Sequence, residues 1–257
     1  MTTINLLLCA IGLFAGMLLC LEIGRSIGRR RLGDQVPGEQ TGLSVFEGAV
    51  FALMGLLLAF TFSGAESRFD EKRNLIVQEA NAVGTAYMRI DLLPASSQPR
   101  LRDDLRSYVD ARLAFYQKLA DPEAAHEETA RATALQKNIW SQAVLASQET
   151  GSPAVTTLVL SSLDTMFDIR TIRAVALQTH PPPTVFLLLI ALALICSLFA
   201  GYGTAGKNRS WIHMVCFAAI LAVTVYVIFD LEYPRGGGWV RLDVVEQVLV
   251  QVRSSMN

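Results

Sequence analysis

The sequence has few charged residues for its length. Asp, Glu, Lys and Arg make up only 18% of its 257 residues, whereas 52% are hydrophobic, and the mean hydropathy is +0.38. A water-soluble protein of this size normally has more charged residues, because its surface must be hydrated. We therefore expect part of the chain to lie in a lipid bilayer.

Basic residues are not in excess either. The 22 Lys and Arg residues are balanced by 23 Asp and Glu residues, which gives a formal net charge of −1. A nucleic-acid-binding domain usually collects positive charge on one face in order to contact phosphates. The sequence thus predicts no nucleic-acid partner.

Residues that ligate metals or act in catalysis are scarce and scattered. The cysteines lie inside apolar runs without the paired spacing of a disulfide or zinc site, and no histidine has a Cys or His partner nearby. No Ser/His/Asp or Cys/His grouping suggests a catalytic centre. We predict no catalytic residue, no metal site and no cofactor, and hence a protein that is not an enzyme. The residues concerned are Cys9, Cys20, Cys196, Cys216, His126, His180 and His213.

The sequence contains four long apolar runs. About 20 helical residues, each with a rise of ~1.5 Å, cross a hydrocarbon core of ~30 Å. The first run has no basic residues before it and no cleavage site of small residues, so we interpret it as a retained helix. These runs predict a multi-pass protein of the cell (plasma) membrane. They cover Ile4 to Gly24, Val45 to Phe62, Thr184 to Gly203 and Trp211 to Leu231.

The segment 64–182 has a different composition. It carries 13 basic and 15 acidic residues, and its apolar residues recur at the spacing of amphipathic helices. Prolines interrupt this pattern, and Ser152 followed by Pro153 is a typical helix start. We predict four helices here: Glu66 to Leu93, Pro99 to about Asp121, Glu123 to Gln148, and a fourth from Ser152 to the prolines at 181–183.

The predicted fold is all-α: a polytopic membrane protein with four transmembrane helices and a helical extramembrane domain between spans two and three. Basic residues in the short loops 25–44 and 204–210 predict that these loops face the cytoplasm and that the domain lies outside. An amphipathic C-terminal tail would lie on the membrane or pack under the domain. The predicted segments are 1–63 with spans one and two, 64–182 with the domain, 183–232 with spans three and four, and 233–257 with the tail.

The second span carries an apolar stripe on one helix face, formed by Phe46, Val50, Leu53, Leu57 and Phe60. Such a stripe fits a hydrophobic constriction that lines a pore and gates by dewetting. Contact with lipid or neighbouring helices is the commoner role of such a stripe. The centres of the spans contain no ionisable residue, which disfavours a secondary active transporter.

Pairs of small residues spaced four apart allow two helices to approach closely. Gly12 and Gly16 form such a pair in the first span, and Gly55 and Ala59 form one in the second. We expect close helix packing at these positions, either within one chain or between copies of it.

Two stretches resemble a bacterial membrane family that is catalogued as a domain of unknown function and labelled bestrophin-like. The stretch from Val50 through Pro94 is similar to its core signature, and the DLEYPRGG stretch from Asp230 to Gly237 is similar to its ending after the last span. The resemblance covers most of the chain. The motif residues are Arg68, Phe69, Asp70, Glu79, Asn81, Asp230 and Pro234.

The resemblance implies a channel-like protein, since bestrophins are pentameric anion channels whose second span lines the pore. Four spans with a helical domain between the second and third suit that architecture. The sequence departs from it in two respects: its basic loops place the domain outside, whereas the bestrophin helical region is cytosolic, and no calcium-binding acidic cluster can be matched. Calcium gating is therefore not carried over.

Two hypotheses about function remain. The first is a homo-oligomeric, bestrophin-like ion channel or pore of the bacterial inner membrane, with membrane lipid, further copies of the chain and inorganic ions as its partners. The second is a non-conducting membrane scaffold or sensor whose helical domain binds a partner.

Overall fold

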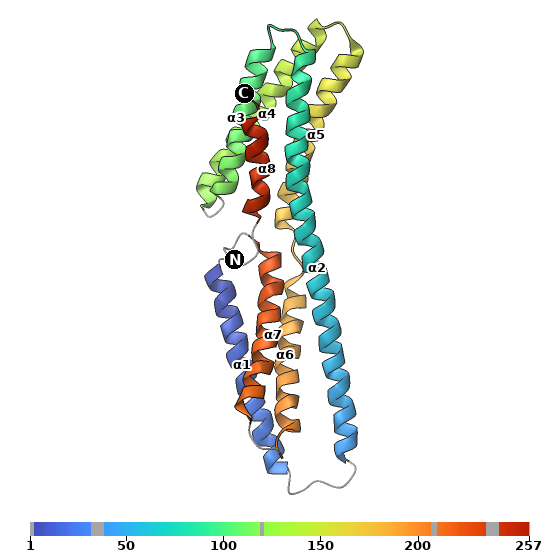
Figure 1. Ribbon diagram of the computed structural model, residues 1–257, viewed down its shortest axis with the longest axis vertical. Coiled ribbons are helices and arrows are strands. Elements are labelled where there is room, and N and C mark those ends of the chain that lie inside the picture. The colour runs from blue at the N-terminus through green and yellow to red at the C-terminus, as the bar shows by residue number, and fades with distance from the viewer. Residues whose placement is uncertain (1–2, 32–38, 119–120, 207–209, 235–241, 257) are drawn as a thin grey trace. The chain divides into compact units, whose positions relative to one another are not determined.

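Helices joined by short turns make up the part of the chain that the structure, a computed structural model, describes: residues 3–31, 39–118, 121–206, 210–234 and 242–256 (Figure 1). These ranges contain no strand, which confirms the predicted all-α fold. The predicted loop 25–44 is shorter than expected, since α1 continues to Arg31 and α2 begins at Glu39. Residues 32–38 and 207–209 of the two basic loops lie outside the described residues. The elements are α1 (Thr3–Arg31), α2 (Glu39–Arg89), the 3-10 turn η1 (Ile90–Leu92), α3 (Gln98–Gln117), α4 (Pro122–Glu149), α5 (Pro153–Gln178), α6 (Pro183–Gly203), α7 (Trp211–Glu232) and α8 (Asp243–Ser254).

The helices begin and end where local chemistry favours it. The Ser152 hydroxyl accepts a hydrogen bond from the Val155 backbone N–H (3.4 Å), so the predicted cap of α5 is confirmed. The Asp121 carboxylate caps α4 in the same way, accepting from the backbone N–H groups of Glu123 (3.1 Å) and Ala124 (3.2 Å). Sequence analysis had placed a helix end at Asp121 but had not recognised this cap.

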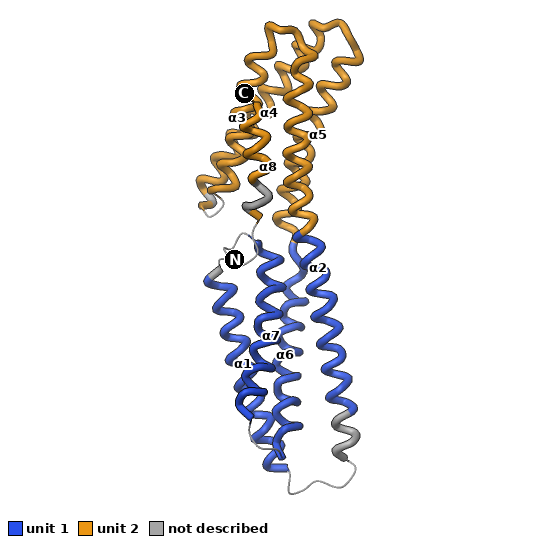
Figure 2. Tube along the Cα trace, viewed as in Figure 1, with its two compact units in different colours: residues 1–69, 180–241 blue, residues 70–179, 242–257 orange. Residues whose placement is uncertain are grey.

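The chain forms two compact units (Figure 2). Unit 1 comprises Met1–Phe69 and His180–Arg241, and unit 2 comprises Asp70–Thr179 and Leu242–Asn257. Helix α8, from the predicted C-terminal tail, is therefore part of unit 2. The division into membrane and extramembrane segments remains a prediction.

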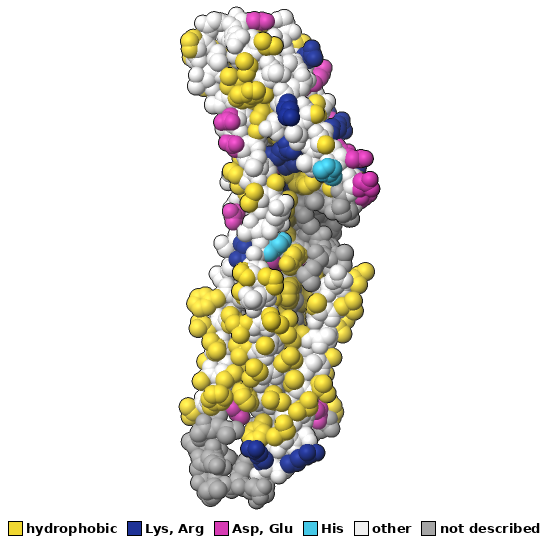
Figure 3. Space-filling view, turned by 180° about the vertical axis from the view of Figure 1, so that it is seen from behind, with side chains coloured by type: hydrophobic (Ala, Val, Ile, Leu, Met, Phe, Trp, Pro, Cys, Tyr) yellow, Lys and Arg dark blue, Asp and Glu magenta, His cyan; other side chains and the backbone are white. Residues whose placement is uncertain are grey.

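Four helical stretches are long and apolar enough to cross a membrane: Ile4–Arg31, Val45–Leu92, Pro153–Gly203 and Trp211–Glu232. The third includes α5 and α6, which residues 179–182 separate. On the face drawn in Figure 3, hydrophobic side chains cover most of unit 1, whereas charged ones are frequent on unit 2. The prediction of four candidate spans is thus confirmed, and the chain has the character of a membrane protein.

Within unit 1, α1 packs against both α6 and α7. The α1–α6 contact brings the two backbones together, because a Cβ atom added to Gly24 would lie 2.0 Å from the Leu198 carbonyl oxygen, and one added to Gly201 would lie 2.1 Å from that of Leu21. Only glycine fits at both positions. The core around this contact includes the buried Met17.

Within unit 2, α3 packs on α4, α4 on α5 and α8 on α3. The core includes the fully buried Leu105 and Met166. Helix α8 is tied to α3 by Arg253, whose Nε and Nη2 donate to the two carboxylate oxygens of Asp110 (2.7 and 2.9 Å). The hydrogen bond to Asp110 is the main reason why the pKa of Arg253 is raised above its usual value. Helix α8 thus packs on α3 within unit 2, while the membrane placement of the predicted tail stays a prediction.

We expect that Gly201→Ala lowers the stability of unit 1, because the added methyl group would meet the Leu21 carbonyl oxygen at less than contact distance. Overpacking of this kind costs about 1–3 kcal/mol of unfolding free energy. Thermal unfolding of the purified protein in detergent measures the effect. Gly12→Ala is the matched control, because nothing lies within 4 Å of its added Cβ. Equal stability of the two variants would contradict the tight α1–α6 contact.

Candidate ion pathway along helix α2

Helix α2 uses only part of its circumference to pack within unit 1. Met54 (3% exposed) and Ala65 (0%) are buried against the core, and the Phe51 ring meets the Phe217 ring of α7 edge-on at 6.2 Å between centroids. The remaining face of the span is open in the single chain. That face is where we look for the predicted pore-lining residues.

The predicted pore stripe divides between these two faces. Phe46 (60% exposed), Leu53 (56%) and Phe60 (69%) lie seven residues apart and are exposed, although the Phe46 ring also meets the Phe199 ring of α6 edge-on at 5.8 Å between centroids. Val50 and Leu57 are partly buried and pack against the core of unit 1. The pore-lining assignment itself stays a prediction, and three of its five residues are accessible in the single chain.

The predicted small-residue pairs also occupy different environments. A Cβ on Gly16 would lie 3.2 Å from Leu194 Cδ2 of α6, so Gly16 belongs to the packing of the chain on itself. Gly12 and Gly55 have open space around them, and Ala59 is exposed. The closest helix contact instead involves Gly24 and Gly201. A signal for it was present, since Gly24 and Gly28 are also four apart, but it was not used.

A charged cluster connects α2 to the end of α7. The carboxylate of Glu232, at the end of α7, is fully buried and accepts from Arg68 Nε of α2 at 3.0 and 3.2 Å. His180 Nδ1, in the turn before α6, lies 3.2 Å from the same carboxylate, and its ring packs on Tyr233 at 4.5 Å. A buried carboxylate needs such partners, because water no longer solvates its charge. The cluster therefore joins three segments of unit 1.

Most of the motif residues of unit 1 lie around this cluster or close to it in the chain. Arg68 is one of its members, Asp230 is 1% exposed, Pro234 is buried, and Phe69 packs on the core. Glu232 was not among the predicted site residues, although it lies within the DLEYPRGG stretch. Residues 235–237 of the DLEYPRGG motif lie outside the described residues.

The other motif residues belong to unit 2. Asp70 is exposed and pairs with Arg73 (3.3 Å), and Asn81 is exposed. Glu79 is fully buried and accepts from Arg112 Nε of α3 (2.7 Å) and from Arg173 Nη1 of α5. Glu79 thus connects α2 to two other helices.

Two tyrosines complete the surroundings of Glu79. The Tyr116 hydroxyl donates to the Glu79 carboxylate at 3.1 Å, and the Arg173 guanidinium lies 3.8 Å from the Tyr116 ring centroid. Burial alone would lower the pKa of Arg112, but Tyr116 and Glu79 outweigh it and raise that pKa, so Arg112 stays charged. Burial also raises the pKa of Tyr108, one turn before Arg112, to about 12. The arrangement has the character of a structural clamp.

Neither cluster resembles a metal centre. In the part of the chain that the structure describes, no group of three or more His, Cys, Asp or Glu residues is arranged to hold a metal ion. The chemistry that the two clusters offer is charge pairing between helices.

Comparison with known families assigns the chain to a family. The profile of the Bestrophin-like domain matches residues 11–239, which is most of the chain. The chain belongs to the bestrophin-like family. The matched region contains α2 and both charged clusters, and the resemblance expected from the sequence is confirmed.

Solved structures share the bestrophin-like fold. A variant of a bacterial bestrophin homologue from Klebsiella pneumoniae has a TM-score of 0.70 at 18% identity, and a second variant has 0.67 at 17%, each match covering 95% of this chain and 98% of that one. A third crystal structure of the homologue has a TM-score of 0.65 at 18% identity, covering 93% and 97%. At this level of identity the likeness shows the fold alone. No match is found among curated proteins.

We expect that Glu79→Gln destabilises unit 2 by about 3 kcal/mol, because Arg112 and Arg173 would remain buried without their carboxylate partner. Hydrogen exchange of α3 and α5 peptides, followed by mass spectrometry, measures the loss. Glu127→Gln on the exposed surface of α4 removes the same charge and serves as the control. Identical exchange in the two variants would show that Glu79 is not a clamp.

Proposed function

We propose that this protein is a homo-oligomeric, bestrophin-like ion channel or pore in which α2 of each copy lies nearest to the axis. The observation that carries the proposal is the open face of α2 with Phe46, Leu53 and Phe60, in a chain of the bestrophin-like family. The partners of such a channel are membrane lipid, further copies of the chain and inorganic ions.

The need for several copies follows from the packing of one. Helix α1 packs on α6 and α7, the Phe186 ring of α6 stacks on the Phe229 ring of α7, and α2 adds one face to this bundle, so the exposed face of α2 points out of the single chain. Ions avoid the apolar centres of such helices, because they lose their hydration there. A ring of copies creates a water-filled path with α2 around it.

The three exposed residues suit a hydrophobic constriction. Rings of phenylalanine and leucine side chains at the heights of Phe46, Leu53 and Phe60 would empty a narrow pore of water and thereby close it to ions. The exposed carboxylate of Glu66 follows on α2 beyond this stretch. The α2 residues that follow Glu66 continue as an ion vestibule in this proposal.

The oligomeric mass of the full-length protein in a mild membrane mimetic tests the first part of the proposal. Native mass spectrometry should give the mass of several copies of the chain, as expected for a closed ring. A monomer at all protein concentrations would contradict the channel, because one copy leaves the path open to lipid.

Leu53→Ser should increase ion flux through the reconstituted protein, because a hydroxyl group at the constriction favours its wetting. Flux from vesicles with verified insertion measures the effect. Leu19→Ser on α1 is the matched control, since Leu19 is similarly exposed (62%) and lies outside α2. Equal flux in both variants, or no flux in any ion gradient, would contradict the assignment of α2 to the pore.

A second candidate function is a non-conducting scaffold or sensor. It is favoured by apolar side chains that unit 2 exposes, among them Met88 (66%), Leu145 (63%) and Val175 (59%). Exposed apolar groups of this kind are typical of surfaces that bind another protein. A monomer without flux would favour this function over the channel.

A further inference from the structure

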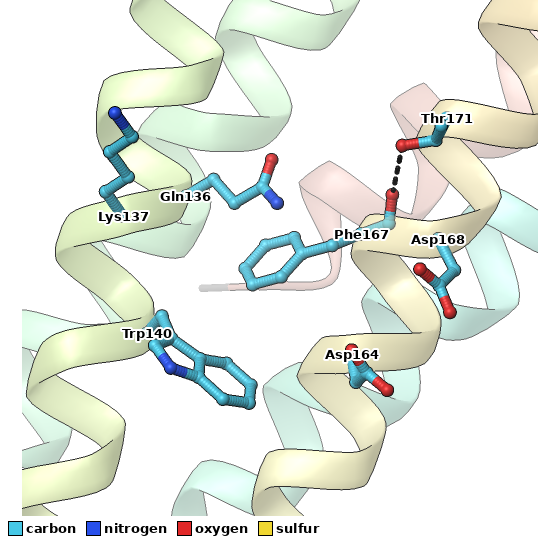
Figure 4. Close-up of a pocket in the computed structure, with 7 residues that line it drawn as sticks. All are labelled: Gln136, Lys137, Trp140, Asp164, Phe167, Asp168 and Thr171. Atoms are coloured by element: carbon cyan, nitrogen blue, oxygen red, sulfur yellow. Dashed lines mark hydrogen bonds between the residues drawn. The ribbon is translucent and has the colours of Figure 1, made fainter.

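A groove lies between α4 and α5 of unit 2, away from the residues assigned to the ion pathway (Figure 4). Its volume is about 300 Å³, which is the lower end of the range for sites of small organic molecules. Helix α4 contributes Gln136, Lys137 and Trp140, and α5 contributes Asp164, Phe167, Asp168 and Thr171.

The floor of the groove is aromatic and held in place. Phe167 is 8% exposed, projects from α5 towards α4, and meets the Tyr108 ring edge-on at 6.0 Å between centroids. Arg170 Nη1 donates to the Gln136 side-chain oxygen at 2.6 Å, so this amide is fixed as well. Trp140 is 38% exposed although it is large and apolar. A ligand would therefore find a rigid aromatic surface already formed, which lowers the cost of binding.

The charges around the groove do not balance. Asp164 and Asp168 lie one turn apart on α5 and are both exposed, and Lys137 is the one cation among the lining residues. Figure 4 shows the Lys137 ammonium group directed away from the two carboxylates. Within the described part of the chain, neither carboxylate forms an ion pair. Like charges at this spacing repel each other, and a cation between them would relieve the repulsion.

We infer that this groove binds a small organic cation, with an ammonium or guanidinium group on an apolar chain. The cationic group lies at Asp164 and Asp168, because carboxylates form charge-assisted hydrogen bonds with such groups. The apolar chain lies against Trp140 and Phe167, whose faces also attract a nearby positive charge. An anion would meet two carboxylates at the rim. A metal ion would leave the aromatic surface unused. The inference is independent of ion conduction.

A neutral analogue of the same shape separates charge recognition from apolar contact. Butylguanidinium and butylurea are titrated into the full-length protein carrying Trp211→Phe and Trp239→Phe, so that Trp140 is the remaining tryptophan and its fluorescence reports on the groove. The guanidinium compound should change this fluorescence with saturation, and butylurea should not. Calorimetric titration of the unsubstituted protein repeats the measurement if these substitutions impair folding.

Three variants assign the binding to the groove. Asp164→Asn combined with Asp168→Asn should weaken butylguanidinium binding about fivefold, since partly exposed ion pairs contribute little each. Lys137→Gln should strengthen it, because the only cation of the lining is removed. Glu127→Gln, on the same helix but outside the groove, should leave it unchanged.

Equal binding of butylurea would overturn the inference, since the groove would then recognise shape alone. So would butylguanidinium binding that the two aspartate substitutions leave unchanged, or the absence of binding in both titrations. None of these outcomes depends on ion flux, so they neither support nor contradict the proposed channel function.

Discussion

Two glutamate carboxylates that are cut off from water determine how the helices of each unit meet. A charge in such a position is tolerated only when cations and hydrogen-bond donors surround it, so its partners cannot move far without a large cost. In unit 1, Glu232 binds Arg68 and lies against His180. In unit 2, Glu79 binds Arg112 and Arg173. Each carboxylate gathers side chains from segments far apart in the sequence.

These contacts constrain the orientation of α2 and thereby which of its residues are available for function. Arg68 holds α2 to unit 1 from one side, and Met54 and Ala65 face the core. Leu53 and Phe60 are then left on the open face. The proposed ion path is thus a consequence of charge pairing and packing elsewhere on the same helix. A sequence pattern alone could not separate this face from its neighbour, because apolar residues occur on every side of the span.

The fold was largely predictable and the site was predictable in part. Apolar runs of about 20 residues, prolines and a serine cap have local effects on the backbone, so the helix bounds could be inferred, including those around Ser152. The pairing of Arg68 with Glu232 joins residues 164 positions apart. Its partners are chosen by tertiary packing, and no periodicity of the sequence reports on it. The α1–α6 contact at Gly24 was also missed: Gly24 and Gly28 have the spacing of a close helix contact, but this spacing does not identify the partner backbone on α6.

The sequence by itself determined which helices are long and apolar enough to cross a membrane, and most of the secondary structure. Those properties depend on the composition of about 20 neighbouring residues and on local caps and breaks. Only the tertiary structure decided which side of α2 is open, which glycines touch a backbone, and that Glu79 and Glu232 are buried. These properties depend on distances between residues that are remote in the chain, and the free energy of burying a charge depends on what surrounds it in space.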